Sequence, residues 1–391
     1  MNENSISKTK NKKIAIFIGS TISQIGGVKK VILELAELFT SIGYTVEIFS
    51  PSIRTEPQFI SNGDIILQEI PCWGLLQGEF PIPKIRLSLI KKIFGYSRND
   101  YKIIITNTRF YPFTVLGWIL SHLYKIPLIH LEHGSNHIIS NKKYIESFGK
   151  VFDHIIGTLI VKYSTTNVGV SKAAKKFIEH LGAEEAEIIY NGLDLSKFDN
   201  AVQIKDFQKQ DKIVLIFIGR LVYLKGIQDL IKIIPELPEK VILYIIGDGP
   251  YRDYLERLAK EIPGDKIKFI GEQPLEKVPS LLKCADIAIN PSYSEGLPTT
   301  VIEACAAGCA VIATDVGGTG EIIEDGRTGF LIPAANLEIL KTKIELLSNN
   351  EDLRKTMGQA ARLSIENNFS FELMQQQWIS LVNKISSNKS R

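Results

Sequence analysis

The sequence predicts an α/β protein with two doubly wound parallel sheets, one after the other along the chain. Its 391 residues suffice for two domains that each bury a core. Short apolar runs of strand length alternate with segments of helical periodicity, and this alternation starts again after a polar stretch near residue 200. The hydrophobic share of 45% and the charged share of 23% exclude a disordered or fibrous chain.

The first half opens with a β-loop-α-β unit. The apolar run 14–18 predicts a strand, and the following loop leads into a segment with the helical apolar positions Val28, Val31, Ile32, Leu35, Leu38, Phe39 and Ile42. Parallel strands joined in this way need a right-handed crossover. Further strands of this half are predicted at 46–49, 65–70, 103–106, 128–131, 167–170 and 187–190.

The second half repeats this pattern after a polar stretch that ends at Lys212 and has the composition of a linker. Its strands are predicted at 213–218, 241–246, 267–270, 286–290, 310–313 and 329–332. The chain then ends differently, because the helical segments 351–367 and 371–385 follow one another with no strand between them. The last of these helices has an apolar stripe that includes Trp378 and Val382, which predicts packing on a domain.

The composition indicates in which cellular compartment the protein works and excludes several classes of function. The four cysteines form no C-x-x-C pair, which argues against a zinc site and a disulfide framework and favours a reducing cytoplasm. Segment 1–13 is polar and basic, so it predicts a flexible terminus and not a signal peptide. The apolar region 110–123 is shorter than the roughly 20 residues of a membrane-spanning helix. The net charge of +3 is modest, so nucleic acid is not an expected partner.

The first functional signal follows the predicted strand 286–290, and ligands of open α/β sheets bind beyond such strand ends. It is the segment Glu295-Gly296-Leu297-Pro298-Thr299-Thr300-Val301-Ile302-Glu303. Pro298 suits the first turn of a helix, where the free amides of Leu297, Thr299 and Thr300 would bind a phosphate. Gly296 would let the main chain approach a ligand, while Glu295 and Glu303 would accept hydrogen bonds from sugar hydroxyls. The alternative is a capped surface helix with incidental glutamates.

A second signal follows the predicted strand 213–218. Here Gly219 and Gly226 flank two cations, Arg220 and Lys225. These cations could clamp a diphosphate, since an arginine can bind two oxygens at once. The alternative is a solvated surface loop.

Two weaker signals lie in the first half. Gly26-Gly27 precedes the first long helix as a phosphate-cradle type of turn, although it matches neither the G-x-G-x-x-G pattern nor the P-loop. His133 stands before a glycine at the end of the strand 128–131, so it is a candidate for a polar contact in the same cleft, whereas His130 is expected to face the core. Either feature could instead be structural.

The chain contains no Asp-x-Asp sequence, the pattern that would hold a divalent metal against a diphosphate. The charge of a departing diphosphate would then fall to Arg220, Lys225 and the helix start. We therefore expect no requirement for a metal or another cofactor.

Together these segments resemble the E-x7-E signature and the other landmarks of the retaining glycosyltransferases of family 4, which have the GT-B fold. The similarity extends from about residue 14 to 378 and is densest after Tyr190. The landmarks are Gly26-Gly27-Val28, His133, Tyr190-Asn191-Gly192-Leu193-Asp194, Gly219-Arg220, Lys225-Gly226, Ile246-Gly247-Asp248-Gly249-Pro250, Glu295 to Glu303, Val316-Gly317-Gly318, Glu321 and Asp325-Gly326-Arg327-Thr328-Gly329.

This resemblance implies two Rossmann-like domains that face each other across a cleft. An acceptor-binding domain would span 14–195, a donor-binding domain 196–371, and the C-terminal helix 372–391 would cross back to the first domain. The donor would be a nucleotide sugar, with UDP favoured and GDP-mannose possible. The acceptor would be a saccharide or a lipid-linked saccharide.

The resemblance also implies roles for single residues. Arg220 and Lys225 would hold the donor diphosphate, Glu303 the ribose hydroxyls and Glu295 the transferred sugar. The main chain around Gly271 would meet the base. Gly27 would lie under the diphosphate or near the acceptor, and His133 beside the donor sugar.

Segment 83–94 mixes lysine and arginine with leucine, isoleucine and phenylalanine, as in a basic amphipathic helix. Such a helix can lie on an anionic membrane surface, so the protein could be peripheral on the inner face of the cell membrane. The alternative is an ordinary helix whose apolar face packs on the sheet.

Two other functions are compatible with the sequence. A nucleotide-sugar epimerase of the same fold would act on the donor without any acceptor. A sugar-binding protein without catalysis could use two lobes, although it has no need of a cation pair and a phosphate-binding helix start. A dinucleotide oxidoreductase is disfavoured, because loop 19–27 lacks the glycine fingerprint.

Overall fold

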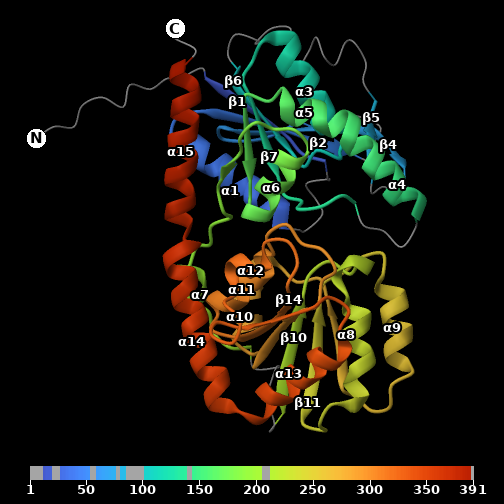
Figure 1. Cartoon of the computed structure of the whole chain (residues 1–391). Coiled ribbons are helices and arrows are strands. Elements are labelled where there is room, and N and C mark those ends of the chain that lie inside the picture. Colours follow the sequence, from blue (N-terminus) through green and yellow to red (C-terminus); the bar gives the residue numbers. More distant parts are fainter. Residues whose placement is uncertain are drawn as a thin grey trace, which may run out of the picture.

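The computed structural model describes residues 12–19, 27–52, 59–75, 80–84, 101–138, 143–204 and 212–388. Several sequence predictions fall outside these ranges: Gly26, residues 1–11 of the basic terminus, and all but the first two residues of segment 83–94. The chain forms two α/β domains stacked along one axis, each built on its own sheet (Figure 1).

The sheet of the first domain has the strand order β3-β4-β2-β1-β6-β7-β8-β9, with β5 paired to β4. Its strands are β1 (Lys13–Phe17), β2 (Thr45–Ser52), β3 (Phe59–Asn62), β4 (Ile65–Leu75), β5 (Phe80–Pro83), β6 (Tyr101–Asn107), β7 (Leu128–Glu132), β8 (Thr166–Gly169) and β9 (Glu187–Ile188). All neighbours are parallel except β3 and β5, which run antiparallel to β4.

Helices cover both faces of this sheet because side chains alternate along each strand. In β1, Ile14 and Ile16 pack in one core with helix α1, whereas Ala15 and Phe17 pack in another with helix α3. The helices of this domain are α1 (Gly27–Ser41), α3 (Pro112–Tyr124), α4 (Lys143–Phe152), α5 (Thr158–Lys162) and α6 (Lys172–His180), whereas the short helix α7 (Ser196–Asp199) lies on the second domain (Figure 1), where Asp199 binds Arg362 at 2.8 Å. A π-helical turn, η2 (Asp153–Gly157), joins α4 to α5.

The sheet of the second domain is parallel throughout, with the order β12-β11-β10-β13-β14-β15. The strands are β10 (Ile213–Ile218), β11 (Val241–Ile246), β12 (Ile267–Gly271), β13 (Ile287–Asn290), β14 (Ala310–Thr314) and β15 (Phe330–Ile332). The helices are α8 (Ile227–Ile233), α9 (Arg252–Lys260), α10 (Val278–Leu282), α11 (Thr299–Ala306), α12 (Thr319–Ile322), α13 (Leu337–Asn349) and α14 (Glu351–Asn368). The predicted strands of this half agree with the observed ones to within one residue.

Two of the first domain's strands are absent from the sequence prediction, namely β3 and β5. Both are four residues long and pair only with β4. The β5 sequence Phe-Pro-Ile-Pro contains two prolines, which a strand tolerates at the edge of a sheet but not in its middle. Such a short segment carries little alternation, so its sequence resembles a turn.

The chain crosses between the domains twice, at neighbouring positions. Leu193 donates from its amide to the Phe369 carbonyl (2.9 Å) and accepts from the Phe371 amide (3.2 Å). Helix α15 (Phe371–Asn388) then runs back along the first domain, where Trp378 packs edge-on against Phe39 at 6.0 Å (Figure 1). The predicted return of the C-terminal helix to the first domain is thereby confirmed.

Candidate functional site

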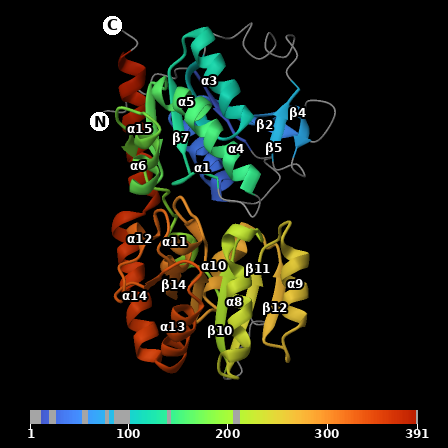
Figure 2. The ribbon, with the colours of Figure 1, turned by 45° about the vertical axis from the view of Figure 1, so that its right-hand side comes forward.

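A cavity of about 300 Å³ lies between the two domains, at the carboxyl ends of strands from both sheets. The facing strand ends are visible in Figure 2. Of the residues that the structure describes, six from the first domain line the cavity, and the second domain contributes the rest, from the loops after β10, β11, β12 and β13. This is the place where ligands bind in open α/β sheets, and the volume lies at the lower end of the usual range for ligand sites.

Most of the predicted site residues meet in this cavity although they are far apart in sequence. Those that line it are Gly27, His133, Gly219, Arg220, Lys225, Glu295, Gly296, Leu297, Pro298, Thr299 and Glu303. Gly271, at the end of β12, is not among the lining residues, and its carbonyl accepts from the Gly247 amide (2.9 Å). The next two residues, Glu272 and Gln273, do line it, so the main chain near Gly271 is adjacent to the cavity.

Helix α11 begins at Thr299 and points its first turn into the cavity. Pro298 is its N-cap residue and not part of its first turn, one position earlier than the sequence prediction. Val301 is the first residue to donate back to the Pro298 carbonyl (3.0 Å). The amides of Thr299 and Thr300 therefore precede the helical hydrogen bonds, as in an anion-binding helix start.

Two residues predicted for different ligand groups are in direct contact. Lys225 Nζ lies 2.6 Å from Glu295 Oε1, and the Ser292 hydroxyl donates to the same oxygen at 2.6 Å. Lys225 ends the short 3-10 helix η3 (Tyr223–Lys225), and the left-handed Gly226 (φ 65°) follows it. The Glu295 carboxylate is thus held in one orientation, with a cation already beside it.

Glu303 also has a cationic partner, and this one comes from the opposite domain. Lys30 Nζ of helix α1 lies 2.7 Å from Glu303 Oε1, across 273 positions of sequence. Burial lowers the pKa of Lys30, but the nearby Glu303 carboxylate outweighs this and raises it, so the lysine stays charged. One turn further along α1, burial raises the pKa of Glu34 to about 7.

Lys30 is not among the residues that the sequence patterns predict for the site. A signal was available, because Lys30 and Glu34 are spaced i, i+4 at the start of the helix that follows β1. That spacing alone describes many solvated helix faces. What distinguishes Lys30 from a lysine on a solvated helix face is its contact with Glu303 of α11, and this contact is visible only in the folded structure.

His133 lies in the cavity wall as expected, and its imidazole ring is uncharged at neutral pH. Burial lowers its pKa to about 4. Its Nε2 lies 3.2 Å from Asn107 Oδ1, while the Asn107 amide group donates to the Phe17 carbonyl at 3.2 Å. Since that oxygen accepts, Nε2 carries the proton and Nδ1 is left as an acceptor. His133 can therefore make a polar contact with a sugar but adds no positive charge.

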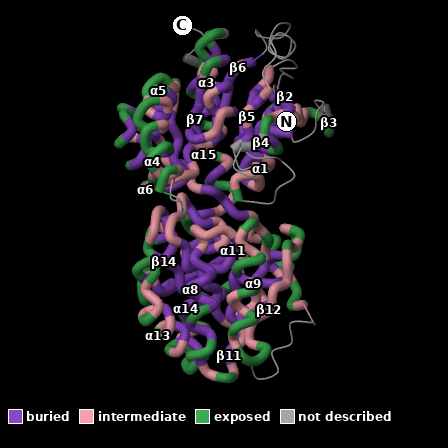
Figure 3. Tube along the Cα trace, turned by 90° about the vertical axis from the view of Figure 1, so that its right-hand side faces the viewer, coloured by how far each residue is buried: buried purple, intermediate pink, exposed green. Residues whose placement is uncertain are grey.

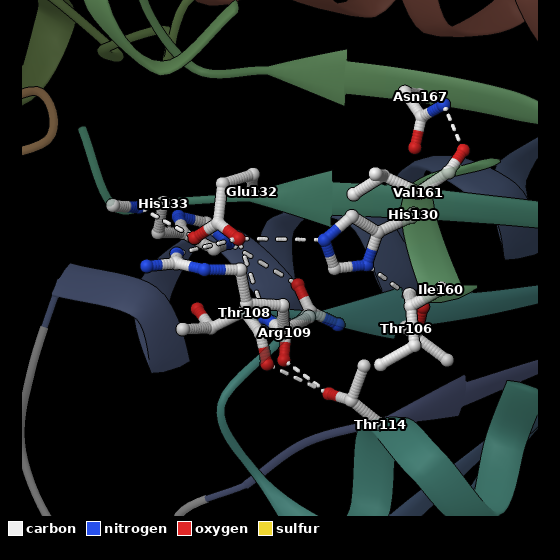
Figure 4. A network of polar contacts seen from close by, with 12 residues as sticks. Thr106, Thr108, Arg109, Thr114, His130, Glu132, His133, Ile160, Val161 and Asn167 are labelled. Carbon is white, nitrogen blue, oxygen red and sulfur yellow. Dashed lines mark hydrogen bonds and ion pairs between the residues drawn. The ribbon is translucent and has the colours of Figure 1, made fainter. Parts of the chain in front are cut away.

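A buried ion network lies directly behind His133 (Figure 4). Arg109 pairs with Glu132 at 3.0 Å and binds the Asp153 carboxylate with two nitrogens at 2.8 and 3.0 Å. Burial by itself raises the pKa of Glu132, but the adjacent Arg109 guanidinium holds it well below its usual range. Glu132 accepts from the Gly134 amide (2.7 Å), so the network fixes the loop that carries His133.

The main chain at Glu295 and Gly296 is clamped between the two domains. From the first domain, Ser135 donates to the Glu295 carbonyl (2.5 Å) and Ser171 to the Gly296 carbonyl (3.1 Å). A Cβ atom on Gly296 would lie 1.6 Å from the His133 carbonyl oxygen. Glycine is needed here because the main chain of the first domain at His133 approaches this closely, and not, as predicted from the sequence, because of a ligand.

Two of the family landmarks form a second bridge between the domains. The Glu321 carboxylate of the second domain accepts from the Lys172 and Ala173 amides at the start of α6 (2.8 and 3.0 Å). It also accepts from the Tyr190 hydroxyl at 2.9 Å. Burial, followed by this contact with Glu321, raises the pKa of Tyr190. The carboxylate complements the positive helix end, so these landmarks fix the domain arrangement.

Within the described ranges, no group of three or more histidine, cysteine, aspartate or glutamate side chains is placed to hold a metal ion. Among the helices that the structure describes, none is both long enough and apolar enough to span a bilayer.

Two protein-family models match the chain in succession. The model described as Glycosyltransferase Family 4 matches residues 25–197, and the model described as Glycosyl transferases group 1 matches residues 199–364. An uncharacterized glycosyltransferase of Methanocaldococcus jannaschii is 32% identical over 374 residues, which cover 92% of this chain and 95% of that protein. A D-inositol 3-phosphate glycosyltransferase of Corynebacterium aurimucosum is 24% identical over 365 residues, 86% of each chain.

Solved structures share the fold at lower sequence identity. Sucrose-phosphate synthase from Thermosynechococcus elongatus superimposes with a TM-score of 0.83 at 20% identity, covering 96% of this chain and all of that one. Anabaena HepE in complex with UDP and glucose gives a TM-score of 0.77 at 20% identity, covering 95% of this chain and all of that one.

Proposed function

The chain belongs to the family-4 glycosyltransferases and has their GT-B fold, and on this premise we propose that it transfers a hexose or N-acetylhexosamine from a nucleoside diphosphate sugar. One observation carries the proposal. Arg220, Lys225 and the start of α11 meet the two glutamates, Glu295 and Glu303, in a single cavity. Cations and free amides suit a diphosphate, and the carboxylates suit hydroxyl groups on either side of it.

In the proposed reaction the bond between the anomeric carbon and the diphosphate oxygen breaks, and an acceptor hydroxyl oxygen bonds to that carbon. The proton of the acceptor hydroxyl passes to the departing diphosphate. Arg220, Lys225 and the amides of α11 would stabilise the negative charge that develops there, which is the largest electrostatic task of the step. We propose retention of configuration, with attack on the face from which the diphosphate leaves.

Glu295 and Glu303 have separate roles in this scheme. Glu295, held by Lys225 and Ser292, would accept from hydroxyls of the transferred sugar. Glu303 would accept from the ribose hydroxyls. His133 would contact the sugar through Nδ1 as a neutral acceptor, and Gly27 would leave room for the diphosphate at the start of α1.

We favour a UDP-sugar as donor, with GDP-mannose as the alternative base and sugar. The structural neighbour HepE, crystallised with UDP and with UDP-glucose, supports this choice. We further propose that no metal is required, and that the acceptor is a saccharide or a lipid-linked saccharide. The setting would be the synthesis of bacterial cell-surface polysaccharide or glycoconjugate, with the enzyme on the cytoplasmic side.

The decisive experiment is a donor panel. UDP-, GDP- and ADP-sugars are each tested for thermal stabilisation with and without EDTA, since a ligand at 100 times its Kd adds about 2.7 kcal/mol. The stabilising donor is then incubated with saccharide acceptors, and the anomeric configuration of the product is read by NMR. Stabilisation by UDP-sugars in EDTA followed by transfer supports the proposal. Donor hydrolysis or epimerisation that needs no acceptor would instead indicate a nucleotide-sugar epimerase. A product with inverted anomeric configuration would refute retention.

A further inference from the structure

The continuous helix formed by α4, η2 and α5 exposes a stripe of large apolar side chains on the first domain. Its members are Tyr144, Phe148, Val151, Ile155, Leu159 and Tyr163, spaced at intervals of four, three, four, four and four. Figure 3 shows exposed positions in green along this helix. Each of these residues is between 36% and 64% exposed to solvent, so the stripe is not part of a core.

The opposite face of the same helix is buried and firmly held. It consists of Gly149, Asp153, Gly157, Ile160 and Val161. Asp153 in the π-helical turn binds Arg109 with both oxygens. A π turn holds more residues per revolution than an α turn, so it brings the later apolar positions back into line with the earlier ones. The orientation of the stripe is therefore set by buried contacts.

Helix α3 widens this surface. Ile119 and Leu123 are 47% and 65% exposed, and the ring of His122 between them lies edge-on to that of Tyr163 at 6.3 Å. We call the six residues of the stripe, which ends at Tyr163, together with Ile119 and Leu123 of α3, the outer apolar face. A contiguous apolar area of this kind marks an interaction site in a water-soluble protein.

Charge surrounds the outer apolar face asymmetrically. Lys125, Lys143, Lys150 and Lys162 are exposed along α3, α4 and α5, against the single acidic side chain of Glu146 among the described residues of α4 and α5 that are not buried. Tyrosines stand near both ends of the stripe, and such rings suit the boundary between lipid and water. The helix as a whole has the composition of one that lies in the plane of a membrane surface.

We propose that the outer apolar face docks the first domain on a membrane that contains anionic lipid. A second copy of the chain fits the same face less well, because a two-fold interface would bring the lysines of one copy against those of the other. The residues between His133 and Ile138 lead from the cavity towards α4, and Ile138 packs on Gly149. Docking would thus hold the cavity near the bilayer, which deepens the proposal of a lipid-linked acceptor and in that part depends on it.

The test is co-sedimentation of the full chain with vesicles of phosphatidylcholine alone or mixed with phosphatidylglycerol. We expect binding to the mixed vesicles only. Val151→Glu with Ile155→Glu should abolish it, and Lys143→Gln with Lys150→Gln and Lys162→Gln should weaken it by roughly fivefold per lysine. The matched control is Leu346→Glu with Leu363→Glu, which places two charges on exposed apolar positions of α13 and α14 and should bind as the unchanged protein does.

Three outcomes would overturn the proposal: equal binding to neutral vesicles, undiminished binding of Val151→Glu with Ile155→Glu, or conversion by that pair of a dimer into a monomer without any vesicle binding. Loss of binding only on Lys91→Glu with Lys92→Glu would assign docking to segment 83–94 instead. Thermal stabilisation by the nucleotide-sugar donor is measured on every variant. It should not change, so a failure of docking is distinguishable from a failure of the proposed transferase function.

Discussion

The two walls of the cavity are built in different ways. In the second domain the predicted ligand-binding charges come from the loop after β10 and from the segment that runs from the loop after β13 into α11, and Lys225 pairs there with Glu295. In the first domain single residues such as Lys30 and His133 come from separate elements, and the loop behind His133 is held by a buried ion network. The wall of the second domain thus carries the charges that would suit a diphosphate. In the wall of the first domain, the position of His133 depends on contacts within the core of that domain.

Because the two walls are built differently, substitutions in them should have different effects. Changes at Arg220 and Lys225 in the second-domain wall should affect the chemical step while leaving stability nearly unaltered. Changes behind the first-domain wall should reduce stability and displace the wall as a whole. The following four experiments separate these effects; the first three are ordered by the size of the expected change, and the fourth varies the pH.

The largest effect is expected from Arg109→Ala. It leaves the buried carboxylates of Glu132 and Asp153 without their cation, which should lower the free energy of unfolding by about 3–5 kcal/mol. Urea-induced unfolding followed by circular dichroism measures this. Arg327→Ala is the matched control, because it removes an exposed arginine from a surface ion pair and should cost less than about 1 kcal/mol. Equal losses in the two variants would refute the contrast.

Next in size are Arg220→Ala and Lys225→Ala. Each removes a cation from the site of the departing diphosphate, and kcat should fall by about 10²-fold or more, the range seen for preorganised charge stabilisers. Steady-state turnover of the identified donor measures the effect. Arg257→Ala on α9 is exposed and does not line the cavity, so its kcat should be unchanged. Normal turnover in both cavity variants would remove the diphosphate assignment.

A smaller effect is expected at the contact between the walls. In a double-mutant cycle of Lys30→Met and Glu303→Gln, the pair should show a coupling of about 1–2 kcal/mol in the free energy of unfolding. Saturating donor should reduce that coupling, because ribose hydroxyls would then share the Glu303 carboxylate. A coupling that is the same with and without donor would show that Glu303 does not contact the ribose.

The fourth experiment concerns pH. The pKa of His133 is about 4 in the folded protein and about 6.5 in the unfolded chain, so between these values the unfolded chain binds the extra proton. Stability that His133 contributes is complete above about pH 6.5 and is lost as the pH falls towards 4. The difference in melting temperature between the unchanged protein and His133→Gln should therefore shift in that window and stay constant from pH 7 to 8. A constant difference at every pH would mean that the ring titrates normally.

Much of the fold was predictable because it depends on local patterns. Strand-length apolar runs and helical periodicity located β10 and β11 to the residue, and the landmarks from Glu295 to Glu303 indicated a segment that lines the cavity. The edge strands β3 and β5 were not predictable, because four residues, two of them proline in β5, do not form a recognisable alternation. Pro298 was placed one position too far into α11, since a helix boundary depends on the main chain that precedes it.

The sequence by itself determined the class of fold, the family and the loops that supply Arg220, Lys225, Glu295 and Glu303. Only the tertiary structure decided how these groups are paired, that Lys30 reaches Glu303 from the other domain, and that Gly296 serves the contact with His133. The physical reason is distance along the chain. Periodicity and loop motifs act over a few residues, whereas an ion pair across 273 positions exists only once both domains have packed.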